Sequence, residues 1–217
     1  MNFEQARFNM IEQQIRPWDV LDQNVLDLLF TVRREDFVPA ELQRLAFADT
    51  EIPLGHGAVM LAPKIEARML QAVAVKKHES VLEIGAGSGY AAALLAAHAA
   101  HVTTLEIVPE LADMARANLR RAQIDNVTVE TANGAGGLPG KAPFDVIVVS
   151  ASVPVVPQEL LAQLKVGGRL FAIVGHEPVM TAQLITRNSE SAFSTQSLFE
   201  TVTAPLTELA PAQKFTF

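Results

Sequence analysis

The chain has 217 residues, of which 49% are hydrophobic and 19% charged, so it can build a full hydrophobic core. Its net charge is −7 and its basic residues do not cluster, which argues against nucleic acid as a partner. The absence of cysteine excludes disulfides and a thiolate nucleophile, and the isolated histidines predict no metal site. No apolar run reaches the roughly 18–20 residues of a spanning helix, and no secretory signal is visible. We therefore expect a cytoplasmic protein without a membrane partner.

The first part of the chain, residues 1–75, is predicted to be mainly helical. Apolar residues at helical spacing indicate three helices, Phe3–Ile15, Asn24–Val32 and Lys64–Val73. The first should end before Arg16-Pro17, because a residue that precedes proline avoids the helical region. A loop rich in proline and glycine is expected from Asp49 to Pro63.

Strands and helices alternate through the second part, residues 76–175. The predicted strands are Val81–Ile84, Val102–Leu105, Val127–Thr131, Asp145–Val149 and Leu170–Val174. The predicted helices between them are Tyr90–Ala99, Pro109–Ala122 and Pro157–Leu164. Such alternation predicts an α/β fold, with a parallel sheet that helices cover on both faces.

The last part, residues 176–217, contains two further predicted strands, Met180–Thr186 and Phe193–Glu200, around a turn. They are expected to pair antiparallel at one edge of the sheet. We find no internal repeat, and we interpret residues 1–217 as one domain.

A glycine-rich turn follows the first predicted strand of the sheet, in the sequence Glu83-Ile84-Gly85-Ala86-Gly87-Ser88-Gly89-Tyr90. Tyr90 stands where a dinucleotide fingerprint needs its third glycine. Ser88 lacks the flanking glycines of a nucleophile elbow. The nucleoside loop of class I S-adenosylmethionine methyltransferases has the pattern acid-x-Gly-x-Gly-x-Gly. Glu83, Gly85, Gly87 and Gly89 match that pattern at every position. A glycine turn without a ligand remains the alternative.

Polar residues end the next two strands. Glu106 lies 17 residues after Gly89 and precedes Ile107. At the end of a strand, its carboxylate can accept hydrogen bonds from both ribose hydroxyls of a nucleoside. The Asn133-Gly134 pair can offer the Asn133 carbonyl oxygen to an adenine amino group. A solvated strand end and a common turn pair are the alternative explanations.

Several ordered segments of the chain resemble the protein-L-isoaspartate O-methyltransferase family. They are Val32–Pro39, Ala46–Asp49, Ile52–Gly55, Val81–Tyr90, Ala142–Asp145, Val156–Leu160 and Gln163–Leu170. The resemblance implies a Rossmann-like class I methyltransferase fold with a mostly parallel seven-stranded sheet, and S-adenosyl-L-methionine as cofactor. It also implies methyl transfer, for protein repair, to isoaspartyl carboxylates of a protein or peptide partner. The implied cofactor residues are Glu83, Gly85, Ala86, Gly87, Gly89, Glu106, Ile107, Asn133 and Gly134.

The chain departs from the family pattern around the acceptor. Leu61 stands where the family has its active-site serine, and Val59 stands where it has a threonine. An apolar side chain disfavours a carboxylate beside it, so we expect Leu61 to limit isoaspartyl activity. Three alternatives stay open: an unidentified small-molecule acceptor, a non-catalytic cofactor-binding module, or another donor such as Thr50, Ser150 or a backbone N–H in place of the serine.

Overall fold

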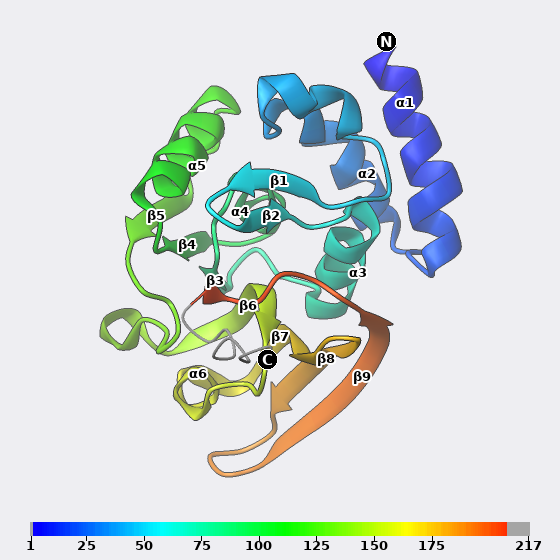
Figure 1. Cartoon of the computed structure of the whole chain (residues 1–217). Helices are drawn as coiled ribbons and strands as arrows, with labels where there is room; N and C mark the ends of the chain where they lie inside the picture. The colour runs from blue at the N-terminus through cyan, green and yellow to red at the C-terminus, as the bar shows by residue number, and fades with distance from the viewer. Residues whose placement is uncertain (1, 208–217) are drawn as a thin grey trace, which may run out of the picture.

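A computed structural model describes residues 2–207 (Figure 1). Its centre is a seven-stranded sheet with the strand order β5-β4-β3-β6-β7-β8-β9. The strands are β3 (Ser80–Ile84), β4 (His101–Glu106), β5 (Val127–Thr131), β6 (Phe144–Val153), β7 (Leu164–His176), β8 (Val179–Arg187) and β9 (Phe193–Thr201). The first five run parallel, and β8 and β9 pair antiparallel at one edge. The predicted fold class is confirmed, and the stretch 208–217 of the last part lies outside the described residues.

Alternating side chains bury both faces of the sheet. In β3, Val81 belongs to one hydrophobic cluster, whereas Leu82 and Ile84 belong to a second cluster on the other face. Successive strand residues point to opposite faces, so a strand covered on both sides is apolar at most positions. The first cluster includes residues of α3 (Pro63–Val73), α4 (Tyr90–Ala96) and α5 (Pro109–Arg121), and the second includes residues of α6 (Gln158–Ala162).

The N-terminal helices begin at polar caps and share the first cluster. The Asn2 side chain accepts from the Gln5 N–H at 3.2 Å and begins α1 (Phe3–Met10), which a π-helical turn extends to Ile15. The Asp22 carboxylate accepts from the Asn24 N–H at 2.9 Å and begins α2 (Gln23–Thr31). Such caps satisfy N–H groups that lack a partner within the helix. Buried residues of both helices pack in the same cluster as the sheet.

The predicted loop from Asp49 to Pro63 is wrong in part, because it contains a hairpin. Strands β1 (Ile52–Gly55) and β2 (Ala58–Met60) pair antiparallel around His56 and Gly57. Both turn residues have positive φ, 55° and 78°, as in the tight turns that suit hairpins. The hairpin lies in front of α4 in Figure 1, beside the carboxyl ends of the parallel strands.

The predicted helix Pro157–Leu164 is too long. α6 ends at Ala162, and the Gln163 carbonyl accepts from the Phe144 N–H at 2.8 Å. Leu164 is then already the cross-strand partner of Phe144. Because β7 pairs with β6 from Leu164 onward, the helix ends before the glycine pair at 167 and 168, which the sequence indicated as its end.

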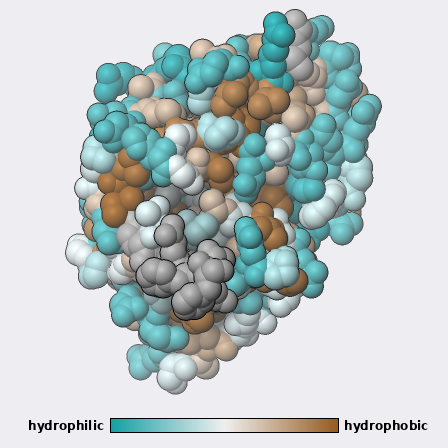
Figure 2. All heavy atoms as spheres, viewed as in Figure 1, coloured by the Kyte–Doolittle hydropathy of each residue, from teal (hydrophilic) through white to brown (hydrophobic). Residues whose placement is uncertain are grey.

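The surface view in Figure 2 shows hydrophobic residues in separate patches divided by hydrophilic ones. Among residues 2–207, no helix combines the length and the apolar character that crossing a bilayer requires.

An arginine clip joins α3 to the sheet. Arg169 of β7 donates to both carboxylate oxygens of Glu79, each at 2.8 Å, and to the Ala74 carbonyl at the end of α3, also at 2.8 Å. It donates to the Val73 carbonyl as well. Burial alone would raise the pKa of Glu79, but Arg169 and the Lys76 N–H lower it below its ordinary value of 4.5.

We predict that Arg169→Met lowers the free energy of unfolding by about 2–3 kcal/mol, because it removes hydrogen bonds to a charged group and to helix carbonyls. Since the folded pKa of Glu79 is depressed, its stabilising effect is present above pH 4.5 and is lost as the pH falls through the folded pKa. The difference from wild type in urea unfolding should therefore shrink in acid.

The matched control is Lys165→Met, which removes the half-exposed pair between Lys165 and Asp145. It should change stability by at most about 1 kcal/mol. Equal losses in the two variants would contradict the role given to the clip.

Candidate functional site

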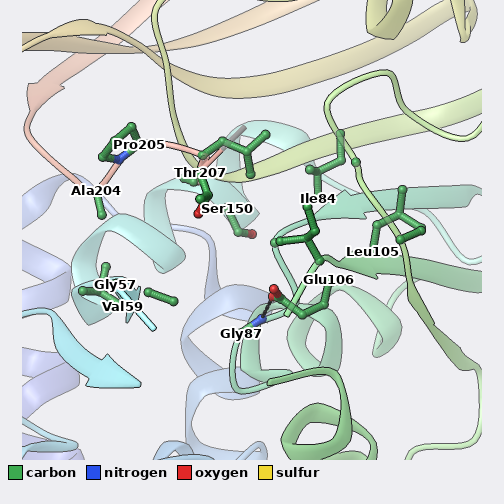
Figure 3. Close-up of a pocket in the computed structure, with 17 residues that line it drawn as sticks. Gly57, Val59, Ile84, Gly87, Leu105, Glu106, Ser150, Ala204, Pro205 and Thr207 are labelled. Atoms are coloured by element: carbon green, nitrogen blue, oxygen red, sulfur yellow. Dashed lines mark hydrogen bonds between the residues drawn. The ribbon is translucent and has the colours of Figure 1, made fainter. Parts of the chain in front are cut away.

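A cleft opens at the carboxyl ends of the parallel strands (Figure 3). Its walls come from the hairpin (57–59), the turn after β3 (Ile84, Gly85, Gly87), the end of β4 (105–107), the segment after β5 (Ala132, Gly134), β6 (Ser150, Ala151) and residues 204–207. Open α/β sheets bind their ligands at this edge.

The glycine turn passes close to the cleft because its backbone adopts conformations that side chains disfavour. Gly85 and Gly87 have φ of 92° and 50° and line the wall. The N–H groups of Gly85 and Ala86 donate to the Leu105 carbonyl at 2.9 and 3.1 Å, which fastens the turn to β4.

Gly89 has a different role. A Cβ there would lie 3.2 Å from the backbone of Ala115, so the missing side chain lets α4 pack against α5. Gly89 is not among the cleft-lining residues of the described chain.

The Glu106 carboxylate lies in the wall beside the turn. Oε2 accepts from the Gly87 N–H at 2.9 Å (Figure 3), and Oε1 accepts from the Val108 N–H at 3.1 Å. The residue is only 6% exposed and lines the cleft. Each oxygen therefore keeps capacity for a further hydrogen bond, which a pair of ribose hydroxyls can use. The residues present fit a nucleoside.

Glu83 lies behind the cleft wall and is completely buried. Its Oε1 accepts from the Ser150 hydroxyl at 2.9 Å, whereas Oε2 is buried without a hydrogen-bond partner. Burial raises the pKa of Glu83 to about 7, against the lowering effect of the Thr104 and Ser150 hydroxyls, and the nearby Glu66 and Glu106 carboxylates raise it further.

The remaining predicted cofactor residues are placed as follows. Ile107 is 39% exposed and lines the cleft, as does Gly134, where a Cβ would lie 2.5 Å from Ile84. Ala86 lines a smaller neighbouring cavity. Asn133 is exposed and lies outside both sets of lining residues; its Oδ1 accepts from the Ala135 N–H at 2.9 Å. A contact between Asn133 and adenine stays a prediction.

Leu61 lines the smaller cavity, which we call the Leu61 cavity and which Val59, Glu66, Gly85, Tyr90 and Ser150 also border. A buried ion pair lies beneath it, between Arg34 and Glu66. Arg34 also donates to the Leu61 carbonyl at 2.6 Å. Burial raises the pKa of Glu66 to about 7, and Arg34 opposes that rise. The arginine thus fixes the backbone of Leu61 relative to α3.

Comparison with known proteins identifies the family. The family model described as protein-L-isoaspartate(D-aspartate) O-methyltransferase matches residues 5–210. A relative of that name from Methanoculleus marisnigri is 45% identical over 78% of this chain and 77% of its own length. Another, from Hyperthermus butylicus, is 37% identical over 94% of this chain and 89% of its own length. The chain belongs to the protein-L-isoaspartate O-methyltransferase family.

Two solved structures agree with this fold. One, a protein-L-isoaspartate O-methyltransferase, superposes with a TM-score of 0.80 at 24% identity over 92% of this chain and 65% of that chain. The other is a candidate member of the same family from Plasmodium falciparum in complex with S-adenosyl-L-homocysteine. It has a TM-score of 0.79 at 21% identity over 96% of this chain and 99% of that chain.

Two walls of the cleft in this family member were missed by sequence reasoning. The hairpin contributes Gly57 and Val59, and the Ile52-x-Leu54 alternation before a glycine turn was a usable signal for it. The segment 204–207 carries no such signal. The Ser152 N–H donates to the Ala204 carbonyl at 2.9 Å and the Leu206 N–H to the Ser152 carbonyl at 2.8 Å, a long-range pairing that fixes it beside β6.

We predict that Glu106→Ala weakens binding of S-adenosylhomocysteine by about tenfold to a hundredfold in calorimetry, because it removes a charged acceptor from the cleft wall. Glu106→Gln should fall between the variant and wild type, since an amide keeps one acceptor oxygen.

The control is Glu110→Ala, an exposed carboxylate in the first turn of α5 that does not line the cleft. It should bind the ligand as wild type does. An unchanged dissociation constant for Glu106→Ala would show that Glu106 has a structural role and does not bind the ligand.

Proposed function

We propose that this family member transfers a methyl group from S-adenosyl-L-methionine to the side-chain carboxylate of isoaspartyl residues in proteins or peptides. The observation that carries the proposal is the buried Glu106 carboxylate in the cleft wall, tied to the glycine turn of a chain whose family membership is established. The Plasmodium falciparum relative, which holds S-adenosyl-L-homocysteine, supports the choice of cofactor.

Different residues of the cleft would contact different parts of the cofactor. Glu106 would accept from the ribose hydroxyls, and the backbone around Ala132 and Gly134 would border the base. Gly85 and Gly87 would let the chain pass close to the ligand. When bound, S-adenosyl-L-methionine supplies an electrophilic methyl group on a sulfonium. Ser150 and Val59 border both the cleft and the Leu61 cavity, so the acceptor would approach from their side.

Methyl transfer to a carboxylate does not require a strong general base. A carboxylate is ionised at neutral pH and is already a nucleophile. The protein's task is to align the acceptor oxygen with the methyl carbon and to exclude water, and such alignment can contribute up to about 7–11 kcal/mol in ideal cases. The hairpin and residues 204–207 line the cleft and would help to exclude water from it.

We predict that S-adenosylhomocysteine raises the melting temperature, because a ligand that binds only the native state stabilises it. With S-adenosylmethionine, the enzyme should methylate an isoaspartyl peptide and leave the matching aspartyl peptide unmodified. Methyl transfer is measured with a radiolabelled donor. Cofactor binding without turnover of the isoaspartyl peptide would contradict the proposed substrate.

We also predict that Leu61→Ser increases the rate on the isoaspartyl peptide by about tenfold, because the hydroxyl adds one hydrogen bond to a charged group. Leu61 is 4% exposed and apolar, which disfavours the approach of a carboxylate. The rate should be compared with the unfolding midpoint, since a smaller side chain leaves a cavity. Leu61→Ala provides the control, because it makes space without a hydroxyl and should not raise the rate. Equal gains in both variants would contradict the role of the hydroxyl.

A further inference from the structure

The acceptor side of the site lacks the family serine but does not lack a hydroxyl. Of the two side-chain hydroxyls that the sequence suggested as replacements, Thr50 is exposed, donates to the neighbouring Glu51 carbonyl at 3.3 Å and does not line the Leu61 cavity. Ser150 lines both that cavity and the cleft. Figure 3 places it between Val59 of the hairpin and Ile84 of β3.

The position of Ser150 follows from the sheet. Val149 is the cross-strand partner of Ile84, so Ser150 is the next residue of β6 and lies beside the glycine turn. A Cβ added to Gly85 would lie 3.8 Å from the Ser150 Cβ, so the two residues face each other. The hydroxyl lies 2.9 Å from Oε1 of Glu83, which is buried behind it.

We propose that the Ser150 hydroxyl contacts the acceptor carboxylate in place of the family serine, and that Glu83 acts as a positioning residue that sets the direction of its hydrogen. This inference rests on the proposed function. A serine hydroxyl has one hydrogen, which can point either to Glu83 or to the acceptor. An ionised Glu83 takes that hydrogen. A protonated Glu83 donates to Oγ and leaves the hydroxyl free to donate to the acceptor.

No proton moves to or from the reacting atoms in this scheme. The acceptor oxygen forms a bond to the methyl carbon, the bond from that carbon to sulfur breaks, and its electron pair stays on sulfur. The products are a methyl ester and a neutral thioether. Ser150 holds the acceptor oxygen that does not react, so its effect falls on acceptor binding and alignment.

The groups facing Glu83 place its titration near neutral pH. The Thr104 hydroxyl of β4 and the Ser150 hydroxyl of β6 favour the ionised form, whereas burial and the Glu66 and Glu106 carboxylates disfavour it. The resulting pKa is about 7. The free hydroxyl is then present below that pKa and is lost above it, so acceptor binding should weaken as the pH rises from about 6 to about 8.

The test compares Ser150→Ala with Thr104→Val at about pH 6, using an isoaspartyl peptide. Thr104 also faces Glu83, and its hydroxyl lowers the pKa of that carboxyl, but it lines neither cavity. Ser150→Ala should raise KM, and the calorimetric Kd of the peptide with S-adenosylhomocysteine bound, by about tenfold or more. The Kd of S-adenosylhomocysteine should rise by a smaller factor than the Kd of the peptide. Thr104→Val should leave KM unchanged.

Two further variants separate contact from general disturbance. Adding Leu61→Ser to Ser150→Ala should restore most of the lost peptide affinity, because a hydroxyl returns to the same cavity. Glu83→Gln, whose amide donates at every pH, should flatten the pH dependence of KM. An unchanged KM in Ser150→Ala, or equal losses in Ser150→Ala and Thr104→Val, would overturn the inference and leave the proposed function intact. Absence of wild-type turnover despite cofactor binding would overturn both.

Discussion

The carboxylate of Glu106 is the constraint on which the site depends. It accepts from the Gly87 N–H in the turn after β3 and from the Val108 N–H that leads into α5. Two turns from neighbouring strands are thereby held to one side chain, at the edge of the sheet where the cleft opens. Since the residue is only 6% exposed, these bonds are made in a poorly solvated place, where an unpaired carboxylate would be costly. The glycine turn and the cleft wall follow from that arrangement.

A second layer, of buried charge, supports the acceptor side. Arg34 pairs with Glu66 and fixes the Leu61 carbonyl, and its guanidinium carbon lies 5.2 Å from the Tyr90 ring centroid. Losing one partner of such a pair leaves an uncompensated buried charge, so the layer constrains which side chains can stand above it. The backbone of the apolar Leu61 is therefore held by this buried ion pair. A polar contact to an acceptor has to come from another wall, and Ser150 is suitably placed on it.

The sequence was informative where local chemistry decides the structure. The strand β5 was predicted with its observed bounds, and the predicted Val81–Ile84 differs from β3 by one residue. The acidic end of β4 could be found because its spacing from the glycine turn follows from the βα unit itself. The placement of Glu106 in the cleft wall agrees with that prediction.

Long-range pairing accounts for most of what the sequence did not predict. The strand β7 begins at Leu164 because β6 pairs with it there, and residues 204–207 reach the cleft because Ser152 binds them from the middle of the sheet. Neither has a local pattern. The Asn133 side chain accepts a hydrogen bond within its own turn, which agrees with the turn pair that the sequence offered as the alternative, and its contact with adenine stays a prediction.

The most direct measurement is a crystal structure of the enzyme with S-adenosylhomocysteine. The ribose hydroxyls should lie within hydrogen-bonding distance of Glu106, with the sulfur facing the space between Ser150 and Leu61. A nucleoside bound away from Glu106, or a sulfur turned away from the Leu61 cavity, would contradict the proposed arrangement of cofactor and acceptor.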